Sequence, residues 1–385
     1  MKPTLVVTAY NRPHALRRLL HSLCKAEYPP GVRLVISIDT GGEHTAKVRR
    51  LAADFRWPHG DKQVIQHEKK LGLIGNVFFG GGLSQTYGAV ILLEDDLFVS
   101  PMFYHYAQQA LDFYADDSRI AGISLNALWF NGFTHHPFTP YLDDADVFFM
   151  QVAWYQGQAY TGTQWAAFTQ WREKSAESET AVPLHELFSS FPDTDWFPLK
   201  TRYLAETDRF YVFPRQSLTT NFGDIGTHFD HTTRFFQVPL QTFRRQFRLS
   251  SLDDSVAVFD SFQELLPRCL NQLTDRFRGY DYAVDLNGAK SPANLRAEYV
   301  LTTRRCRSPL FTFGKVMRPL AANVVEGVPG NGIYFGKTAD LEKGRLASLI
   351  QQQSNDDYFM RGRRLGRRKR MLFWLARLLQ RAGVR

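Results

Sequence analysis

Short hydrophobic runs alternate with amphipathic stretches through the first third of the chain. The first run is Leu5-Val6-Val7, and the stretch opened by Pro13 then places its leucines on one helix face, at Leu16, Leu19, Leu20 and Leu23. Further runs at 34–38, 63–66, 89–93 and 120–124 have the length of strands. Strands that alternate with helices build a parallel sheet covered by helices, so the pattern predicts an α/β fold.

The alternation fades after about residue 130, where aromatic, glycine and proline residues dominate, and residues 250–345 show a mixed pattern. With 385 residues, 44% of them hydrophobic, the chain can form one large domain or two ordinary ones. Its three cysteines are too far apart for a disulfide scaffold or a four-cysteine zinc site. No apolar run is long enough for a transmembrane helix, and the N-terminal run is too short for a signal peptide.

Polar residues follow three of the expected strands. Arg12 stands shortly after the first strand, Asp39 ends the second, and Glu94-Asp95-Asp96 directly follows the hydrophobic run at 89–93. Ligands of open α/β sheets bind outside the carboxyl ends of the strands, where these side chains would meet. We therefore expect them to form one site.

Three adjacent carboxylates repel one another unless something offsets their charge. A divalent cation does so, because Mg2+ and Mn2+ prefer oxygen ligands and often bind one or two carboxylates together with substrate phosphates. The alternative for Glu94-Asp95-Asp96 is a solvated turn at the end of a strand.

Asp39 and Arg12 also have two interpretations each. Asp39 could accept the imide hydrogen of a uracil ring, or it could cap the helix that follows. Arg12 could bind phosphate together with a helix start that Asn11 can cap, or it could be a surface arginine. The glycines at 80–82 lack the Lys-Ser/Thr of a phosphate-binding loop and indicate close packing or flexibility.

Four motifs in order resemble those of GT-A glycosyltransferases. They are Thr8-Ala9-Tyr10-Asn11-Arg12-Pro13, Ser37-Ile38-Asp39-Thr40-Gly41, Lys70-Leu71-Gly72-Leu73-Ile74-Gly75-Asn76-Val77 and Ile91-Leu92-Leu93-Glu94-Asp95-Asp96-Leu97. The resemblance is to the Glu-Asp-Asp type, which includes bacterial surface-polysaccharide transferases and the alpha-mannoside beta-1,2-N-acetylglucosaminyltransferases.

This resemblance implies a mixed, mostly parallel Rossmann-like sheet with helices on both faces, plus a C-terminal extension. Residues 1–125 would be the half that binds the nucleotide sugar, and residues 126–250 the half that binds the acceptor and carries catalysis. Residues 251–360 would be an extension of unknown role, followed by a basic amphipathic tail at 361–385.

The resemblance also assigns roles to matching positions. It implies that Asp96 binds a metal, Mn2+ or Mg2+, while Glu94 and Asp95 contact the sugar and ribose of the donor. Arg12 would hold the diphosphate of a UDP-sugar, and Asp39 its base. Further donor-binding positions in the motifs are Thr8, Tyr10 and Asn76.

Inverting sugar transfer needs a carboxylate to take the proton of the acceptor hydroxyl. The candidates beyond the acidic cluster are Asp193, Asp195, Glu206 and Asp208, and Asp195 is chosen because Asp195-Trp196 resembles the pair that holds the base in the animal enzymes. An ordinary loop acid is the alternative. His228 lies in a Gly-rich stretch, 221–229, that resembles a late family motif, and it could contact metal or diphosphate.

The resemblance thus implies a metal-dependent hexosyltransferase. It would move a sugar from a nucleotide diphosphate sugar, a UDP-sugar, to a glycan or lipid-linked glycan, with inversion, in surface polysaccharide synthesis. Two alternatives stay open. One is a catalytically inactive GT-A-like carbohydrate-binding or scaffold protein, and the other is a nucleotidyltransferase-like enzyme, which would normally need an N-terminal Gly-rich loop with a lysine.

The net charge of +9 belongs to the C-terminal tail. Residues 361–385 contain ten Arg or Lys and no acid, which leaves 37 basic against 38 acidic residues in the body. Basic residues beside the apolar run Met371-Leu372-Phe373-Trp374-Leu375-Ala376 suit an anionic membrane surface. We therefore expect a cytoplasmic protein, peripheral on the inner face of the membrane, and no nucleic acid partner. A helix packed on the body is the alternative.

Overall fold

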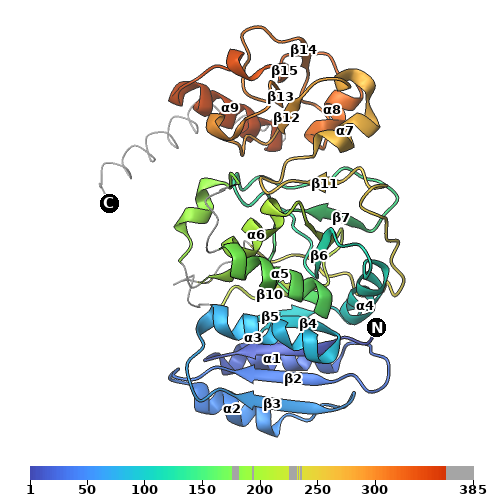
Figure 1. Cartoon of the computed structure of the whole chain (residues 1–385), viewed down its shortest axis with the longest axis vertical. Helices are drawn as coiled ribbons and strands as arrows, with labels where there is room; N and C mark the ends of the chain where they lie inside the picture. The colour runs from blue at the N-terminus through green and yellow to red at the C-terminus, as the bar shows by residue number, and fades with distance from the viewer. Residues whose placement is uncertain (176–181, 193–194, 225–231, 233, 235, 361–385) are drawn as a thin grey trace. The chain divides into compact units, whose positions relative to one another are not determined.

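The computed structural model describes residues 1–175, 182–192, 195–224, 232, 234 and 236–360 (Figure 1). The chain divides into two compact units. The first consists of Met1–Phe133 and Pro140–Asp275, and the second of Thr134–Thr139 and the chain from Arg276 onward. The expected tail at 361–385 lies outside the described residues.

The first unit is built on a nine-stranded sheet with the order β11-β7-β9-β6-β8-β4-β1-β2-β3. Its strands are β1 (Thr4–Ala9), β2 (Leu34–Ile38), β3 (Lys62–Gln66), β4 (Ala89–Glu94), β6 (Ile120–Ser124), β7 (Val147–Met150), β8 (Gln158–Thr161), β9 (Phe210–Pro214) and β11 (Val258–Phe259). Strands β4, β1, β2 and β3 are all parallel, whereas β8 is antiparallel to β4 and to β6. The sheet is therefore mixed and its N-terminal half parallel, as the hydrophobic pattern predicts.

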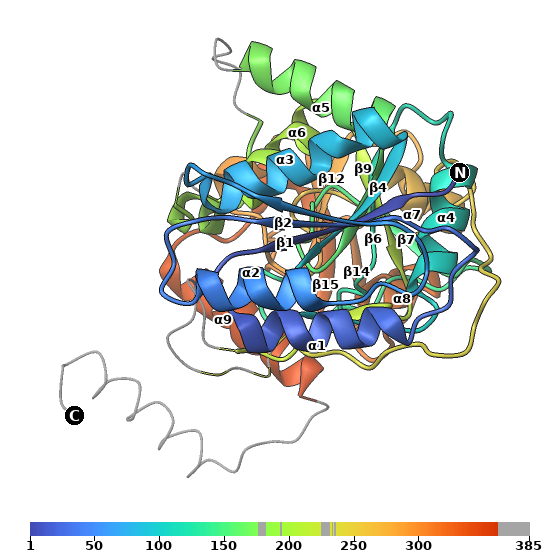
Figure 2. The same cartoon turned by 90° about the horizontal axis from the view of Figure 1, so that it is seen from below.

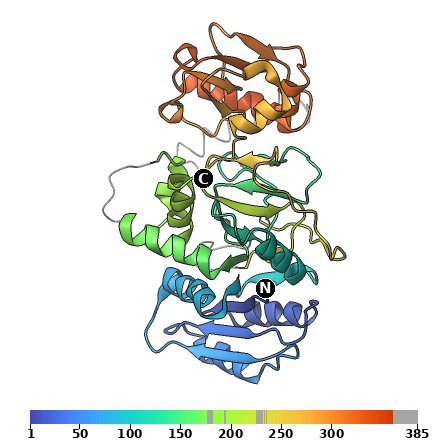
Figure 3. The same ribbon diagram turned by 45° about the vertical axis from the view of Figure 1, so that its right-hand side comes forward.

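Helices cover both faces of this sheet. Figure 2 shows α1 (Pro13–Cys24) and α2 (Thr45–Asp54) on one face of β1 and β2, and α3 (Gly72–Tyr87) on the other. Helix α5 (Gly162–Ser175) runs beside α3, as Figures 2 and 3 show. The other helices of this unit are α4 (Phe103–Phe113), α6 (Trp196–Glu206) and α7 (Pro267–Leu273), and a 3-10 turn spans Glu186–Ser190. The predicted leucine face of α1 is fully buried.

Helix α3 contains the glycines at 80–82, which the sequence indicates only as close packing or flexibility. A Cβ at Gly80 would lie 2.7 Å from Leu92 Cδ1 of β4, and one at Gly81 would lie 2.1 Å from the ring of Trp165 in α5. Glycine is a poor helix former, so the helix here depends on this close packing rather than on local preference. The close-packing interpretation is confirmed. That these glycines lie in a helix is seen only in the tertiary structure.

The start of α1 differs from the expectation that Asn11 caps it. Arg12 occupies the cap position, where its side chain makes no hydrogen bond to the helix, and Pro13 begins the helix. The Asn11 carboxamide instead accepts the backbone N–H of His44 in the loop between β2 and α2. The prediction of this cap is wrong because Asn11 ties the two loops together.

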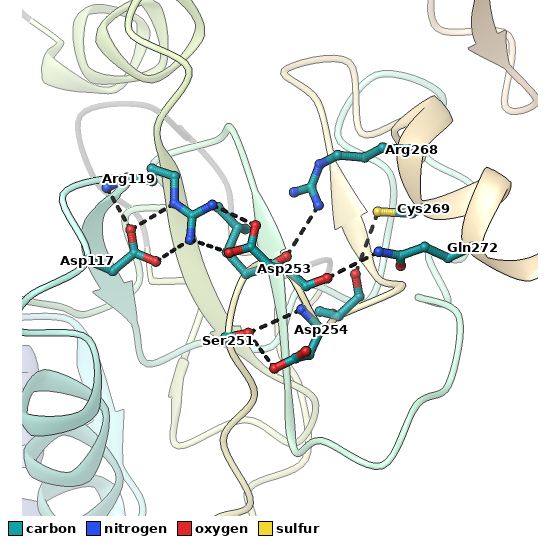
Figure 4. Close-up of polar contacts among 10 residues, drawn as sticks. Asp117, Arg119, Ser251, Asp253, Asp254, Arg268, Cys269 and Gln272 are labelled. Atoms are coloured by element: carbon teal, nitrogen blue, oxygen red, sulfur yellow. Dashed lines mark hydrogen bonds and ion pairs between the residues drawn. The ribbon is translucent and has the colours of Figure 1, made fainter. Parts of the chain in front are cut away.

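Residues 251–275, expected to begin the C-terminal extension, pack with the first unit. Figure 4 shows Arg119, which precedes β6, between two carboxylates: its Nε donates to Asp117 Oδ1 at 2.9 Å, and its Nη1 donates to Asp253 Oδ1 at 2.7 Å. From α7, Gln272 Nε2 donates to the carbonyl oxygen of Asp253 at 3.1 Å. The Arg119 contact attaches the segment to the loop before β6, and the Gln272 contact holds the segment together internally.

The second unit has its own four-stranded sheet with the order β12-β13-β15-β14. Its elements are β12 (Tyr282–Asp285), β13 (Tyr299–Thr302), β14 (Phe311–Phe313), β15 (Ile333–Lys337), α8 (Leu320–Val325) and α9 (Arg345–Phe359), with 3-10 turns at Asp275–Phe277, Pro292–Asn294 and Thr338–Asp340. Buried polar contacts attach α9 to this sheet, since Gln351 Nε2 and Asn355 Nδ2 both donate to Thr303 Oγ1. In the described part of the chain, no helix is long and apolar enough to cross a membrane.

Candidate active site

The carboxyl ends of β1, β2 and β4 lie at one edge of the sheet. Thr8 of β1 is in register with Ser37 of β2 on one side and with Glu94 of β4 on the other. The residues that follow these strands therefore come together, as predicted from their positions in the sequence. This edge holds Arg12, Asp39 and the acidic cluster, which we define as Glu94, Asp95 and Asp96.

Arg12 binds two members of the acidic cluster at once. Its Nη2 donates to Asp95 Oδ1 at 2.5 Å, and its Nη1 donates to Asp96 Oδ2 at 3.0 Å. The Asp95 side chain is 5% exposed, while those of Asp96 and Arg12 are 27% and 32% exposed. Asp95 also accepts the backbone N–H of Tyr10. Asp95 is thus an internal anchor, whereas the Asp96 side chain is partly exposed.

Burial shifts the titration of the acidic cluster. It raises the pKa of Asp95 to about 6, although the charge of Arg12 opposes the shift. Burial also raises the pKa of Glu94 well above its usual range, and the negative charge of Asp96 adds to the effect. Crowded carboxylates in low dielectric resist ionisation unless a cation compensates them. The cluster therefore has a strong affinity for positive charge.

Asp39 uses both carboxylate oxygens on backbone N–H groups. Its Oδ1 accepts from Thr40 at 2.8 Å and from Leu71 at 2.9 Å, and its Oδ2 accepts from Gly72 at 2.9 Å. Asp39 therefore caps α3, rather than α2, the next helix along the chain. Each carboxylate oxygen has a second lone pair, so the cap leaves acceptor capacity at this edge.

The remaining donor-binding candidates have different surroundings. Asn76 of α3 is buried and accepts the Ser37 hydroxyl at 2.6 Å, which joins α3 to β2. Thr8 is buried, and its Oγ1 donates to the carbonyl oxygen of Leu93. Tyr10 is half-buried and lies beneath the Lys70 ammonium, 5.6 Å from the ring centroid. Asn76 and Thr8 therefore position the strand ends, whereas Tyr10 is accessible at the edge.

Asp195 begins α6, where its Oδ1 accepts the backbone N–H of Phe197 at 2.9 Å. Its charge acts on Glu94 and on Tyr155. Burial raises the pKa of the Tyr155 hydroxyl, and the charges of Glu94 and Asp195 add to it. The structure thus brings Asp195 into electrostatic range of the acidic cluster, from a segment about a hundred positions further along the chain. Asp193 lies outside the described residues.

Aromatic side chains flank the same site. Trp154 is buried and stacks on Tyr155 with ring centroids 4.7 Å apart, and Tyr155 packs edge-on against Phe197 of α6. Trp165 instead fills the space over Gly81, and Trp129 is 47% exposed. Tyr155 thus lies within electrostatic range of Glu94 and Asp195.

Arg18 is a site residue that the sequence analysis missed. It forms an ion pair with Asp224 and lies over the ring of Phe222, 4.2 Å from the centroid. The charges of Asp96 and Arg12 both act on it. One signal was present, because Phe222 and Asp224 belong to the Gly-rich stretch that contains His228. The stretch reaches the site because β10 (Thr219–Asn221) pairs with β5 (Leu97–Val99), the strand after Asp96.

The Gly-rich stretch is described only as far as Asp224, so His228 lies outside the described residues. Within the described residues, no group of three or more His, Cys, Asp or Glu side chains is arranged to hold a metal ion. Mg2+ and Mn2+ are often bound through one or two carboxylates plus substrate phosphates. The half-exposed Asp96 carboxylate fits a cation held jointly with a phosphorylated ligand.

The chain is a glycosyltransferase with a GT-A fold. Residues 4–136 match the model of glycosyl transferase family 2, over the range that runs from β1 to just beyond β6. The matched residues include Arg12, Asp39 and the acidic cluster. The enzyme class and fold expected from the four motifs are therefore confirmed.

Solved structures show weaker similarity. TarS from S. aureus in complex with UDP-GlcNAc is 14% identical, with a TM-score of 0.37, over 59% of this chain and 60% of that one. GalNAc-T7 with UDP, GalNAc and Mn2+ is 13% identical, with a TM-score of 0.37, over 55% of this chain and 42% of that one. A mannosyltransferase from Pyrobaculum calidifontis with GDP-Man and Mn2+ is 13% identical, with a TM-score of 0.30, over 42% of this chain and 44% of that one. This chain thus covers less than two thirds of each. No curated protein sequence matches it.

Proposed function

We propose that this protein transfers a sugar from a UDP-sugar to a glycan or lipid-linked glycan, with inversion and with a divalent cation, in surface polysaccharide synthesis. One observation carries the proposal: a guanidinium, three crowded carboxylates and a helix-capping carboxylate from a distant segment surround the same edge of the sheet. Together with a divalent cation that offsets the excess of carboxylates, these groups would suit a ligand that carries both a diphosphate and a hydroxyl-rich sugar.

The donor would lie across the ends of β1, β2 and β4. Asp39, at the end of β2, would accept the imide hydrogen of uracil, and the half-exposed Arg12 would bind the diphosphate. Asp96 would share Mn2+ or Mg2+ with that diphosphate; the cation would neutralise the charge on the leaving group. Glu94 and Asp95 would face the sugar and ribose. Thr8, Tyr10 and Asn76 would shape the edge on which the donor rests.

Asp195 would take the proton of the acceptor hydroxyl as that oxygen attacks the anomeric carbon. Its place as the cap of α6 fixes the carboxylate, because Oδ1 is held by Phe197 N–H. The neighbouring half-buried Tyr155, which stacks on the buried Trp154, would provide an apolar surface for a sugar ring.

A donor screen tests the proposal. Purified protein is incubated with Mn2+ and each of several nucleotide sugars, and binding and hydrolysis are measured. We expect a UDP-sugar to bind and to be hydrolysed, and Asp96→Ala to abolish hydrolysis, while Asp61→Ala on the exposed surface leaves it intact. If no nucleotide sugar binds in the presence of metal, the proposal is wrong. Binding without hydrolysis would favour the inactive carbohydrate-binding alternative.

We also propose that the basic tail, residues 361–385, places the enzyme at the cytoplasmic face of an anionic membrane. Each basic residue near such a surface contributes about 1 kcal/mol. The full chain should sediment with anionic vesicles and not with neutral phosphatidylcholine vesicles, and deletion of 361–385 should release it. Equal sedimentation of the full and truncated chains with anionic vesicles would refute this placement.

A further inference from the structure

Arg12 lies where a cation would otherwise compensate the acidic cluster. Its two Nη atoms contact Asp95 and Asp96, whose carboxylates come from adjacent positions at the end of β4. The Asp95 carboxylate is fixed in place, because the side chain is buried and also accepts the backbone N–H of Tyr10. The contact with Asp96 is the more exposed of the two, because the Asp96 side chain is 27% exposed and the Asp95 side chain 5%. Arg12 can therefore leave Asp96 while staying attached to Asp95.

The neighbouring Arg18 does not replace Arg12 in this role. Arg18 is paired with Asp224 and covered by the Phe222 ring. Asp224 thus engages the charge of Arg18, although Arg18 lies within electrostatic range of Asp96. Of the two arginines, Arg12 is the one that contacts the solvent-facing carboxylate directly.

A divalent cation and the Arg12 guanidinium compete for Asp96. A cation that binds Asp96 repels Arg12 and takes its acceptor, so cation binding costs the ion pair. A diphosphate changes this balance because it offers Arg12 new anionic oxygens at the same edge, and guanidinium groups bind phosphate oxygens well. The cost of freeing Asp96 then falls.

We propose that Arg12 couples the two ligands: it holds Asp96 until a nucleoside diphosphate draws it away, and the cation then binds Asp96 and the diphosphate together. This inference rests on the proposed function, because it concerns the same donor site. Coupling of this kind is reciprocal, so the cation must raise nucleotide affinity by the factor by which the nucleotide raises cation affinity.

Binding of Mn2+ by itself tests the proposal without any reaction. Free Mn2+ is measured by electron paramagnetic resonance during titration of the full-length protein, with and without UDP. We expect Arg12→Gln to bind Mn2+ alone about 5-fold more tightly than wild type, at the lower end of typical couplings. We also expect UDP to raise Mn2+ affinity less in Arg12→Gln than in wild type. Arg17→Gln, on the exposed face of α1, removes the same charge and should leave both affinities unchanged.

A second variant, Arg12→Lys, provides the test if Arg12→Gln does not fold. Arg12→Lys retains the charge but cannot hold two carboxylates with one planar group, so its affinity for Mn2+ alone should be intermediate. If folded Arg12→Gln or Arg12→Lys binds Mn2+ alone no more tightly than wild type, the coupling is refuted while the proposed function stands. If wild type binds neither UDP nor Mn2+ in the presence of the other, the proposed function itself fails.

Discussion

Asp39 at the end of β2 holds the first turn of α3, because its Oδ2 accepts the backbone N–H of Gly72 at 2.9 Å. Its Oδ1 accepts from Leu71 and Thr40. One side chain thus joins the base end of the proposed donor site to a helix that begins more than thirty positions later. A substitution there would affect stability as well as nucleotide binding.

We expect Asp39→Ala to lower the free energy of unfolding by about 2 kcal/mol, the upper range for loss of a helix cap. Asp39→Asn keeps one acceptor oxygen and should lose about half as much. Urea unfolding followed by circular dichroism measures both, with Asp61→Ala as the exposed control. An Asp39→Ala protein as stable as wild type would contradict the capping role.

A substitution of Asp195 should lower the transfer rate without lowering the free energy of unfolding. Asparagine caps helices about as well as aspartate, so Asp195→Asn should keep the Phe197 contact and unfold within about 0.5 kcal/mol of wild type. It cannot take a proton, so the transfer rate should fall at least about 100-fold. Donor affinity, measured by calorimetry with UDP and Mn2+, should be unchanged. Full activity of Asp195→Asn would show that another group is the base.

The acidic cluster predicts a pH dependence of stability. Burial raises the pKa of Asp95 from 3.8 to about 6, so the folded chain binds a proton here that the unfolded chain has released between those pH values. The stability from this proton is fully present below pH 3.8 and is lost as pH rises through about 6. The loss is about 3 kcal/mol at most.

Asp95→Asn removes this titration. The difference in unfolding free energy between wild type and Asp95→Asn, measured in chelator at pH 4 to 8, should therefore shift in favour of the variant as pH rises. A difference that stays constant across this range would show that Asp95 is not shifted. Comparison with Asp61→Asn, whose side chain is exposed, separates this effect from that of surface carboxylates.

Two adjacent glycines in α3 should respond in opposite ways to alanine. At Gly81 a Cβ would lie 2.1 Å from the Trp165 ring, so Gly81→Ala should destabilise the protein by about 1–3 kcal/mol through overpacking. At Gly82 the nearest atom is Trp165 Nε1 at 3.8 Å, an ordinary contact. Gly82→Ala should therefore stabilise by up to about 1 kcal/mol through helix preference. Thermal unfolding of the pair measures both, and equal effects would contradict the packing of α3 on α5.

Much of the first unit follows from local sequence. The runs at 34–38 and 120–124 are strands with the expected bounds, and the leucines of α1 face the core. A short hydrophobic run forms a strand, so the acids that directly follow it lie at the end of that strand. This holds for any position of the strand in the sheet. Glu94-Asp95-Asp96 could therefore be placed at the site from spacing alone.

The middle of α3 could not be recognised in the same way. Its three glycines oppose a helix, and the apolar residues of α3 are not gathered on one face. The helix forms because Leu92 and Trp165 approach the glycine backbone closely, and these contacts come from other segments of the chain. Similarly, asparagine is a residue type that caps helices, yet the Asn11 side chain accepts the backbone N–H of His44 instead.

By itself, the sequence determined the first strands and the carboxylates at their ends, because these depend on spacing along the chain, and the resemblance of four motifs indicated the class of enzyme. Only the tertiary structure decided how these groups are paired. Arg12 reaches Asp96 across 84 positions, Arg18 meets Asp224, and Asp39 caps α3 instead of the next helix. Such pairings depend on sheet order and helix packing, which bring together charges that have no fixed separation in the sequence.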